Sequence, residues 1–143
     1  MVLLLFGLVS APTAALADDD RVTRRGGCQG PSRWLLRLTE RDDPDRIAVR
    51  YTVRTPRAGH RWRVTLRRNG RTFFRGIRAT RRPSGNFTVR RTIRESDGRD
   101  LIRARARNLR SGNLCTGFAV LRDDDRDDDR DDRRGDDRDD RDD

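Results

Sequence analysis

The chain of 143 residues contains no lysine, one histidine, two glutamates and two cysteines. It also lacks an apolar run of about 20 residues, the length that a transmembrane helix needs, so we expect no integral membrane span. One histidine, His60, and two widely separated cysteines make a poor set of metal ligands. No motif brings His60 to a serine and an acid. We therefore expect no metal, no other cofactor and no enzymatic activity.

Arginine is the residue that the chain has in excess. All 34 basic residues are arginine, and with 24 acidic residues they give a net charge of +10. The charge is unevenly placed: residues 1–17 carry none, residues 18–122 carry +18 and residues 123–143 carry −8. A basic body is therefore followed by an acidic segment. The codon bias of a GC-rich genome accounts for arginine in place of lysine.

The first 17 residues have the pattern of a signal peptide. An apolar run, Val2 to Val9, is followed by Pro12 and by the small-x-small site Ala15-Leu16-Ala17. No basic residue precedes the run, so either the true start lies upstream or the free amino terminus supplies the positive charge. A buried helix of the mature domain is the alternative to a signal peptide. We expect a protein that is secreted, extracellular or held in the cell envelope.

The two cysteines, Cys28 and Cys115, predict a disulfide, because an exported chain with an even cysteine count usually pairs them. Closing a loop of 87 residues stabilises the fold by about 4–5 kcal/mol in the chain-entropy description.

Between residues 28 and 122, apolar and polar residues alternate with the period of half-buried strands. We expect an all-β, seven-stranded immunoglobulin-like (fibronectin type III-like) sandwich over residues 28–122, with a flexible leader over 18–27. The tail, 123–143, is of low complexity and has no apolar residue, so we expect it to be disordered. One sheet would hold the strands near 34–39, 47–53 and 87–93, and the other those near 61–67, 71–77, 101–106 and 114–121.

Asn69-Gly70 is the strongest hairpin signal in the chain. A plain two-residue turn would place Leu66 opposite Phe73 and Trp62 opposite Ile77, all facing the core. Arg75 would then face inward opposite Val64, unless a bulge or an arginine reaching the rim resolves the conflict.

Several short motifs carry a resemblance over residues 28–121. They are Cys28-x-Gly30-x-Ser32-x-Trp34-x-Leu36, Trp62-Arg63-Val64-Thr65-Leu66 with Asn69-Gly70, Ser84-Gly85-x-Phe87-x-Val89, Asp100-x-Ile102-x-Ala104-x-Ala106, and Gly112 before Cys115. In these the chain resembles small exported immunoglobulin/fibronectin-like β-sandwich proteins of high-GC bacteria. The resemblance implies export and the sandwich fold, and it brings no assigned activity. The arginine density and the acidic tail depart from it.

Outward-facing arginines are the best candidate for a functional surface. If the strands near 61–67 and 101–106 are neighbours, six guanidinium groups form one ladder: Arg61, Arg63, Arg67, Arg103, Arg105 and Arg107. Arg50, Arg54, Arg90 and Arg94 would do the same on the other sheet. Arginine suits phosphate and sulfate, because its planar fork donates two parallel hydrogen bonds.

The predicted partner is therefore a polyanion: a wall polymer, a nucleic acid or a sulfated glycan. Phe74 is the one aromatic residue expected to face outward here, which disfavours a dedicated single-strand binder. Two alternatives remain: codon bias with a solvated surface, and a protein-binding or adhesive module that uses its loops. The tail is interpreted as a solvated end, an internal competitor for the arginines, or a loose Ca²⁺ binder.

Overall fold

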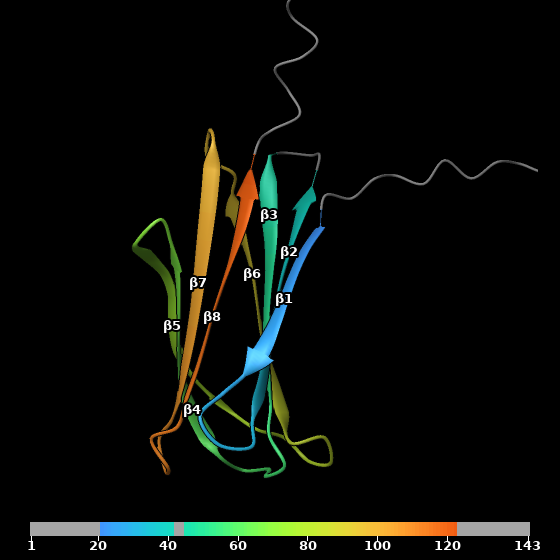
Figure 1. The fold of residues 1–143 in the computed structure, drawn as a ribbon, viewed down its shortest axis with the longest axis vertical. Helices are drawn as coiled ribbons and strands as arrows, with labels where there is room; N and C mark the ends of the chain where they lie inside the picture. The colour runs from blue at the N-terminus through green and yellow to red at the C-terminus, as the bar shows by residue number, and fades with distance from the viewer. Residues whose placement is uncertain (1–20, 42–44, 123–143) are drawn as a thin grey trace, which may run out of the picture.

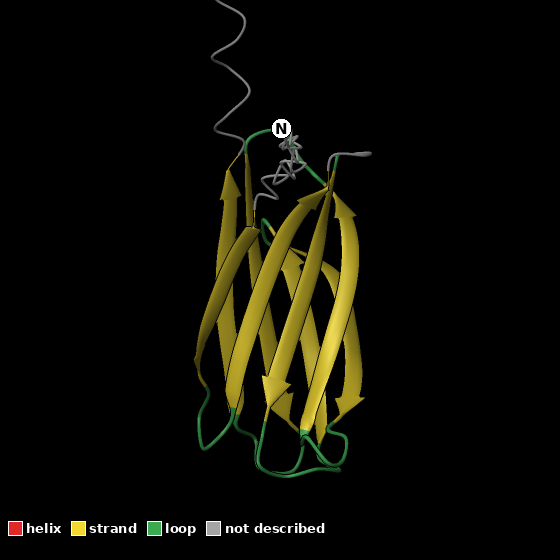
Figure 2. Cartoon of the chain, turned by 90° about the vertical axis from the view of Figure 1, so that its right-hand side faces the viewer, coloured by secondary structure: helices red, strands yellow, loops and turns green. Residues whose placement is uncertain are grey.

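A computed structural model describes residues 21–41 and 45–122. They form two antiparallel sheets of four strands, packed face to face, with no helix in these two ranges (Figures 1 and 2). The all-β class is therefore confirmed. The predicted signal peptide, 1–17, and the predicted tail, 123–143, lie outside the described residues.

The two sheets have the following strand orders. The first is β1 (Arg21–Gly27), β2 (Arg33–Arg41), β3 (Arg46–Arg54) and β6 (Asn86–Arg94). The second is β5 (Arg71–Ala79), β4 (Arg61–Arg68), β7 (Arg99–Asn108) and β8 (Leu114–Arg122). The seven expected strands divide between the sheets as predicted.

The expectation of seven strands was wrong, because β1 is an eighth. It lies within the segment 18–27, which we had predicted to be a flexible leader, and it pairs along its whole length with β2. The sequence of β1 shows little apolar alternation. Its pairing is instead supported by the side chain of Trp34 on the neighbouring strand β2. Gly26 lies opposite Trp34, and a Cβ atom on Gly26 would be 2.8 Å from the indole ring. The indole ring thus occupies the space beside Gly26 that a side chain would fill.

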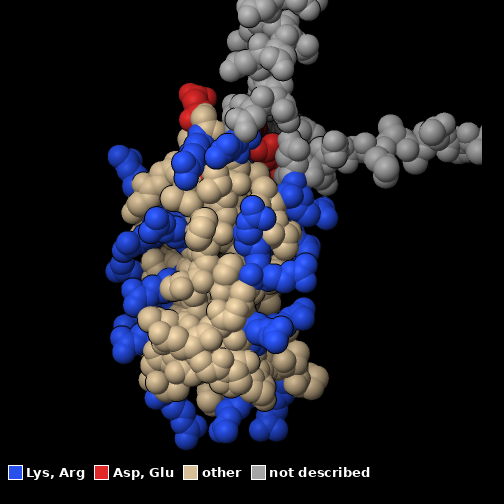
Figure 3. Space-filling model, viewed as in Figure 1, with Lys and Arg blue, Asp and Glu red and all other residues tan. Residues whose placement is uncertain are grey.

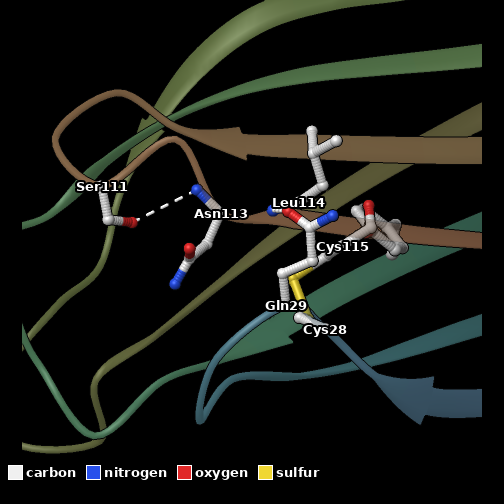
Figure 4. The surroundings of a disulfide bond; sticks show 7 residues. Cys28, Gln29, Ser111, Asn113, Leu114 and Cys115 are labelled. Atoms are coloured by element: carbon white, nitrogen blue, oxygen red, sulfur yellow. Dashed lines mark hydrogen bonds between the residues drawn. A yellow bond between two sulfur atoms is a disulfide. The ribbon is translucent and has the colours of Figure 1, made fainter.

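The sandwich is closed along the edge where β1 and β2 meet β8. The Cys28–Cys115 disulfide joins them there, which confirms the predicted pairing (Figure 4). The backbone N–H of Gln29 donates to the carbonyl of Leu114, at 2.8 Å. The ring of Trp34 also reaches across to β8, since a Cβ atom on Gly117 would lie 2.4 Å from it.

The core lies between the two sheets and is built from inward-facing residues of both. Trp62 of β4 and Phe87 of β6 pack across the gap with their ring centroids 6.1 Å apart. The hydroxyl of buried Tyr51 on β3 donates to the carbonyl of Cys115 on β8, at 3.1 Å. The sheets are therefore joined by apolar contact, a hydrogen bond and a disulfide.

The β4–β5 hairpin turns at Asn69-Gly70, as predicted, and both residues have positive φ. The facing pairs that we expected were wrong, because the register shifts between Leu66 and Arg67. Leu66 lies opposite Phe74, which is buried, so the prediction that Phe74 faces outward was also wrong. The shift turns the exposed Arg75 away from the core. A bulge in the hairpin therefore keeps Arg75 out of the core, which is one of the two solutions that we expected.

Candidate functional site

Arginines lie opposite one another on the outer face of the second sheet. Arg63 on β4 pairs with Arg107 on β7, and Arg67 pairs with Arg103, four residues further along β4. All four side chains are exposed. Like charges directly opposite each other destabilise an antiparallel pair. The folding of β4 and β7 therefore has to overcome this repulsion.

A third row lies between these two. Thr65 of β4 is half-buried and lies opposite Arg105 of β7 on one side and Arg75 of β5 on the other. Rows two residues apart along a strand are about 7 Å apart, so positive charge recurs at that interval. We call this surface the β4–β7 face; its arginines are Arg63, Arg67, Arg75, Arg103, Arg105 and Arg107.

A shallow groove of about 930 Å³ runs over the β4–β7 face. Thr65 and Thr116 contribute short polar side chains to it, and Phe118 of β8 lines one side. Phe118 lies opposite Arg103 and is 63% exposed. The groove thus combines guanidinium groups with hydroxyls and one apolar ring, a set that suits an anionic polymer with apolar carbon faces.

The six predicted arginines all occupy exposed, outward positions of β4 and β7. Four of them, Arg63, Arg67, Arg103 and Arg105, line the groove. Arg61 and Arg107 do not line it, and Arg61 lies at the start of β4, where its carbonyl accepts a hydrogen bond from the N–H of Leu109 at 2.9 Å. Sequence reasoning missed Arg75 because the bulge sets its direction. It also missed Phe118, although Cys115 and Ala119 facing inward would have indicated that Phe118 faces outward.

The tip of the β4–β5 hairpin is attached to β7, which holds the rows in register. The side chain of Asn69 accepts a hydrogen bond from the N–H of Leu101 at 2.9 Å and donates to the carbonyl of Arg99 at 3.1 Å. The N–H of Asn69 donates to the carbonyl of Leu101 at 3.0 Å. The turn therefore extends the pairing of β4 with β7 beyond the last row of arginines.

Acidic residues are few in the described ranges and lie away from this face. These ranges contain 28 arginines and five acidic residues, a net charge of +23. The acidic residues lie in or beside the β2–β3 and β6–β7 turns, at the end shown at the top of Figure 3: Glu40, Asp45, Glu95, Asp97 and Asp100. None of them is an outward residue of β4, β5, β7 or β8.

Asp100 is an acid that belongs to the fold rather than to the face. It is 2% exposed and accepts hydrogen bonds from the hydroxyl and the N–H of Ser96, at 2.6 and 3.1 Å. Nε of Arg68 lies 3.6 Å from its carboxylate. This carboxylate is thus occupied within the β6–β7 turn and leaves the outer arginines uncompensated.

The first sheet carries arginines on its outer face as well. Arg50 of β3 lies opposite Arg90 of β6, as predicted, and Arg37 of β2 extends the row on the other side. The other two predicted residues lie apart from this row: Arg54 faces Asn86, and Arg94 faces Arg46. The alternation in β2 already marked Arg37 as outward, but its alignment with Arg50 follows from the register.

His60 is half-buried and directly precedes the first residue of β4. Its Nδ1 lies 3.1 Å from the side-chain nitrogen of Asn108, and its backbone N–H donates to the hydroxyl of Thr80 at 3.0 Å. Within 21–41 and 45–122, no group of three or more histidine, cysteine or acidic residues is arranged to hold a metal ion.

Comparison with known proteins assigns no relative: no protein-family model, no curated protein and no solved structure matches the chain. Nor does the described part of the chain contain a helix of the length and apolarity that crossing a membrane requires. The disulfide is a feature more typical of extracellular proteins than of cytosolic ones.

Proposed function

We propose that the protein is an exported, non-enzymatic binding module that holds polyanions on its β4–β7 face. The observation that carries this proposal is the pairing of Arg63 with Arg107 and of Arg67 with Arg103. Like charges directly opposite each other reduce the stability of the free sheet. A ligand whose negative charges lie over the rows reverses the sign of that interaction.

The ligand class follows from the chemistry of the face. Guanidinium groups donate paired hydrogen bonds to phosphate and sulfate oxygens, and rows about 7 Å apart suit a polymer that carries such groups repeatedly. One exposed ring, Phe118, lines the groove. Stacking of several successive bases would need more rings than this. A phosphate- or sulfate-bearing polymer that is bound through its charges therefore fits the face better than a single-stranded nucleic acid does.

The proposal includes the type of fold and the site of action. The strand orders β2-β3-β6 and β5-β4-β7-β8 support a fibronectin type III-like sandwich with β1 added at one edge. The disulfide and the signal pattern over 1–17 support action outside the cell or in the envelope. We propose membership of the small exported sandwich proteins of high-GC bacteria on the same grounds.

An alternative function is a protein-binding or adhesive module. It is favoured by exposed apolar side chains, namely Leu109 after β7, Ile77 on β5 and Phe118 on β8. Binding through such contacts would resist salt, whereas binding through arginines weakens as salt rises. Salt dependence therefore separates the two functions.

The test is elution from heparin, polyphosphate and duplex DNA resins in a salt gradient. The full chain and a version ending at Arg122 are both expected to elute above physiological salt. Elution of both versions below physiological salt would exclude polyanion binding. Comparing the three resins distinguishes sulfate from phosphate as the preferred group.

Two matched variants assign the binding to the face. Arg63→Gln/Arg67→Gln/Arg103→Gln removes three charges from the rows. The control also removes three exposed charges, but from the β3–β4 and β5–β6 turns: Arg57→Gln/Arg81→Gln/Arg82→Gln. The first variant is expected to elute at clearly lower salt than the control. Equal shifts would show that net charge alone determines retention.

A further inference from the structure

The outer face of the first sheet has a groove of its own. Its centre is a row of three arginines on adjacent strands: Arg37 of β2, Arg50 of β3 and Arg90 of β6. The next row consists of short side chains, Thr39, Ala48 and Thr92, which form a low floor beside the arginines. The groove has a volume of about 800 Å³, and none of its lining residues lines the groove of the β4–β7 face.

Arg37 is the distinctive residue of this row. Its side chain is half-buried, and its Nε is enclosed with no hydrogen-bond partner in the described residues. An enclosed donor that lacks a partner is unfavourable, and the penalty is larger when the group is charged. Arg50 lies directly opposite and adds repulsion. An oxyanion in this groove would relieve the repulsion between Arg37 and Arg50, and its hydrogen bonds to the accessible guanidinium nitrogens would be charge-assisted.

Acidic residues do little to neutralise this row. Glu40 is the one acidic side chain among the residues that line the groove, at the end of β2, and it has interactions of its own. Arg21, Arg41 and Arg91 line the groove as well. The described lining of the groove thus contains six arginines and a single carboxylate.

The two sheets pack face to face (Figure 2). Each groove lies on the outer side of its own sheet, so the two grooves face in opposite directions. Figure 3, which looks toward the closed edge, shows arginines mainly along the two flanks of the molecule, with uncharged surface between them. Packed sheets are about 10 Å apart. A polymer segment on one face therefore leaves the opposite groove open to a second segment.

We infer that the Arg37–Arg50–Arg90 row is a second polyanion site and that one molecule bridges two polyanion strands. This inference rests on the proposed function of the β4–β7 face, since bridging requires both faces. The ligand is the same phosphate- or sulfate-bearing polymer. The consequence is crosslinking: the protein would condense a long polymer rather than coat it.

Light scattering of the full-length protein mixed with long-chain polyphosphate tests the inference. Wild-type protein is expected to scatter strongly at intermediate ratios and to clear in excess polymer, when each molecule holds one strand. Arg37→Gln/Arg50→Gln/Arg90→Gln is expected to lose the scattering while remaining bound to polyphosphate beads. The turn variant Arg57→Gln/Arg81→Gln/Arg82→Gln is expected to keep both properties. Tripolyphosphate, which is too short to bridge, is expected to produce no scattering.

The possible failures are distinguishable. Wild-type protein that is captured on beads but does not scatter overturns the inference and leaves the proposed function intact. A first-sheet variant that scatters like wild type also overturns the inference, because a dimer binding through the β4–β7 face alone would behave in that way. Wild-type protein that is not captured overturns the proposed function. If the Arg37 substitution impairs folding, Arg50→Gln/Arg90→Gln, with both side chains exposed in the wild type, makes the same test.

Discussion

The inner and outer faces of the same strands differ in whether their residues favour or oppose folding. On β7, Ile102, Ala104 and Ala106 point inward and are buried, while Arg103 and Arg105 between them point outward. These inner residues pack in the apolar core, and on the neighbouring strand β8 the buried Cys115 forms the disulfide and accepts a hydrogen bond from the hydroxyl of Tyr51. The outer residues meet like charges on the neighbouring strand.

This contrast separates stability from binding. The inner face accounts for the fold, whereas the outer rows of arginines oppose it by repulsion. A surface that reduces stability without serving the core is common at functional sites. Substitutions on the two faces should therefore have opposite effects on stability, and only those on the outer face should affect retention on a polyanion.

The largest effect on the inner side is expected from Cys28→Ser/Cys115→Ser. Removing the link across 87 residues should lower the free energy of unfolding by about 4–5 kcal/mol. Urea unfolding measures the loss. Retention on heparin below the unfolding temperature should be unchanged. A parallel loss of retention in the folded variant would contradict the separation of the two faces.

Gly117→Ala should have the next largest effect. Its Cβ would lie 2.4 Å from the ring of Trp34, so the two sheets or the indole must shift. Overpacking of this kind costs about 1–3 kcal/mol. The matched control is Thr116→Ala, one residue away on the exposed outer face, which should change the urea midpoint little. Equal midpoints for the two variants would show that the packing of Trp34 does not require the space beside Gly117.

Tyr51→Phe should cost about 1 kcal/mol through loss of the hydrogen bond to Cys115. Burial raises the pKa of Tyr51 above its usual value near 10. Because the neutral form is favoured in the folded state, the contribution of Tyr51 to stability should be constant below about pH 10, and wild-type stability should fall as the pH rises further. The chain has one tyrosine and no lysine, so this decline should be absent from the variant. Chemical denaturation of both proteins at pH values below and above 10 measures the decline.

The smallest effect on stability, and one of opposite sign, is expected from Arg67→Thr. Removing the charge opposite Arg103 should raise the free energy of unfolding by about 0.2–1 kcal/mol while lowering retention on heparin. Thr is a good strand residue, so propensity does not offset the gain. Thermal melting measures the change in stability, and elution from heparin in a salt gradient measures the change in retention. A destabilised variant would show that Arg67 serves the fold.

The alternation of residue types predicted the strands, their division between the sheets and the outward arginines of β4 and β7. It could not predict β1, because the space beside Gly26 is filled by Trp34 from the next strand. Nor could it place Arg75, whose direction depends on a bulge at the hairpin. The alignment of Arg37 with Arg50 is likewise a matter of register. All three features depend on how two strands pair, and the sequence of a single strand does not determine that pairing.

The most direct measurement of the central claim is the salt dependence of binding to duplex DNA as a reference polyanion. Each phosphate contact contributes about 0.9 to the slope of log K against log salt concentration. Arg63→Gln/Arg67→Gln/Arg103→Gln should reduce that slope by roughly 2–3, while Arg57→Gln/Arg81→Gln/Arg82→Gln should leave it nearly unchanged. The same slope in both variants would contradict the claim that the β4–β7 face is the binding surface.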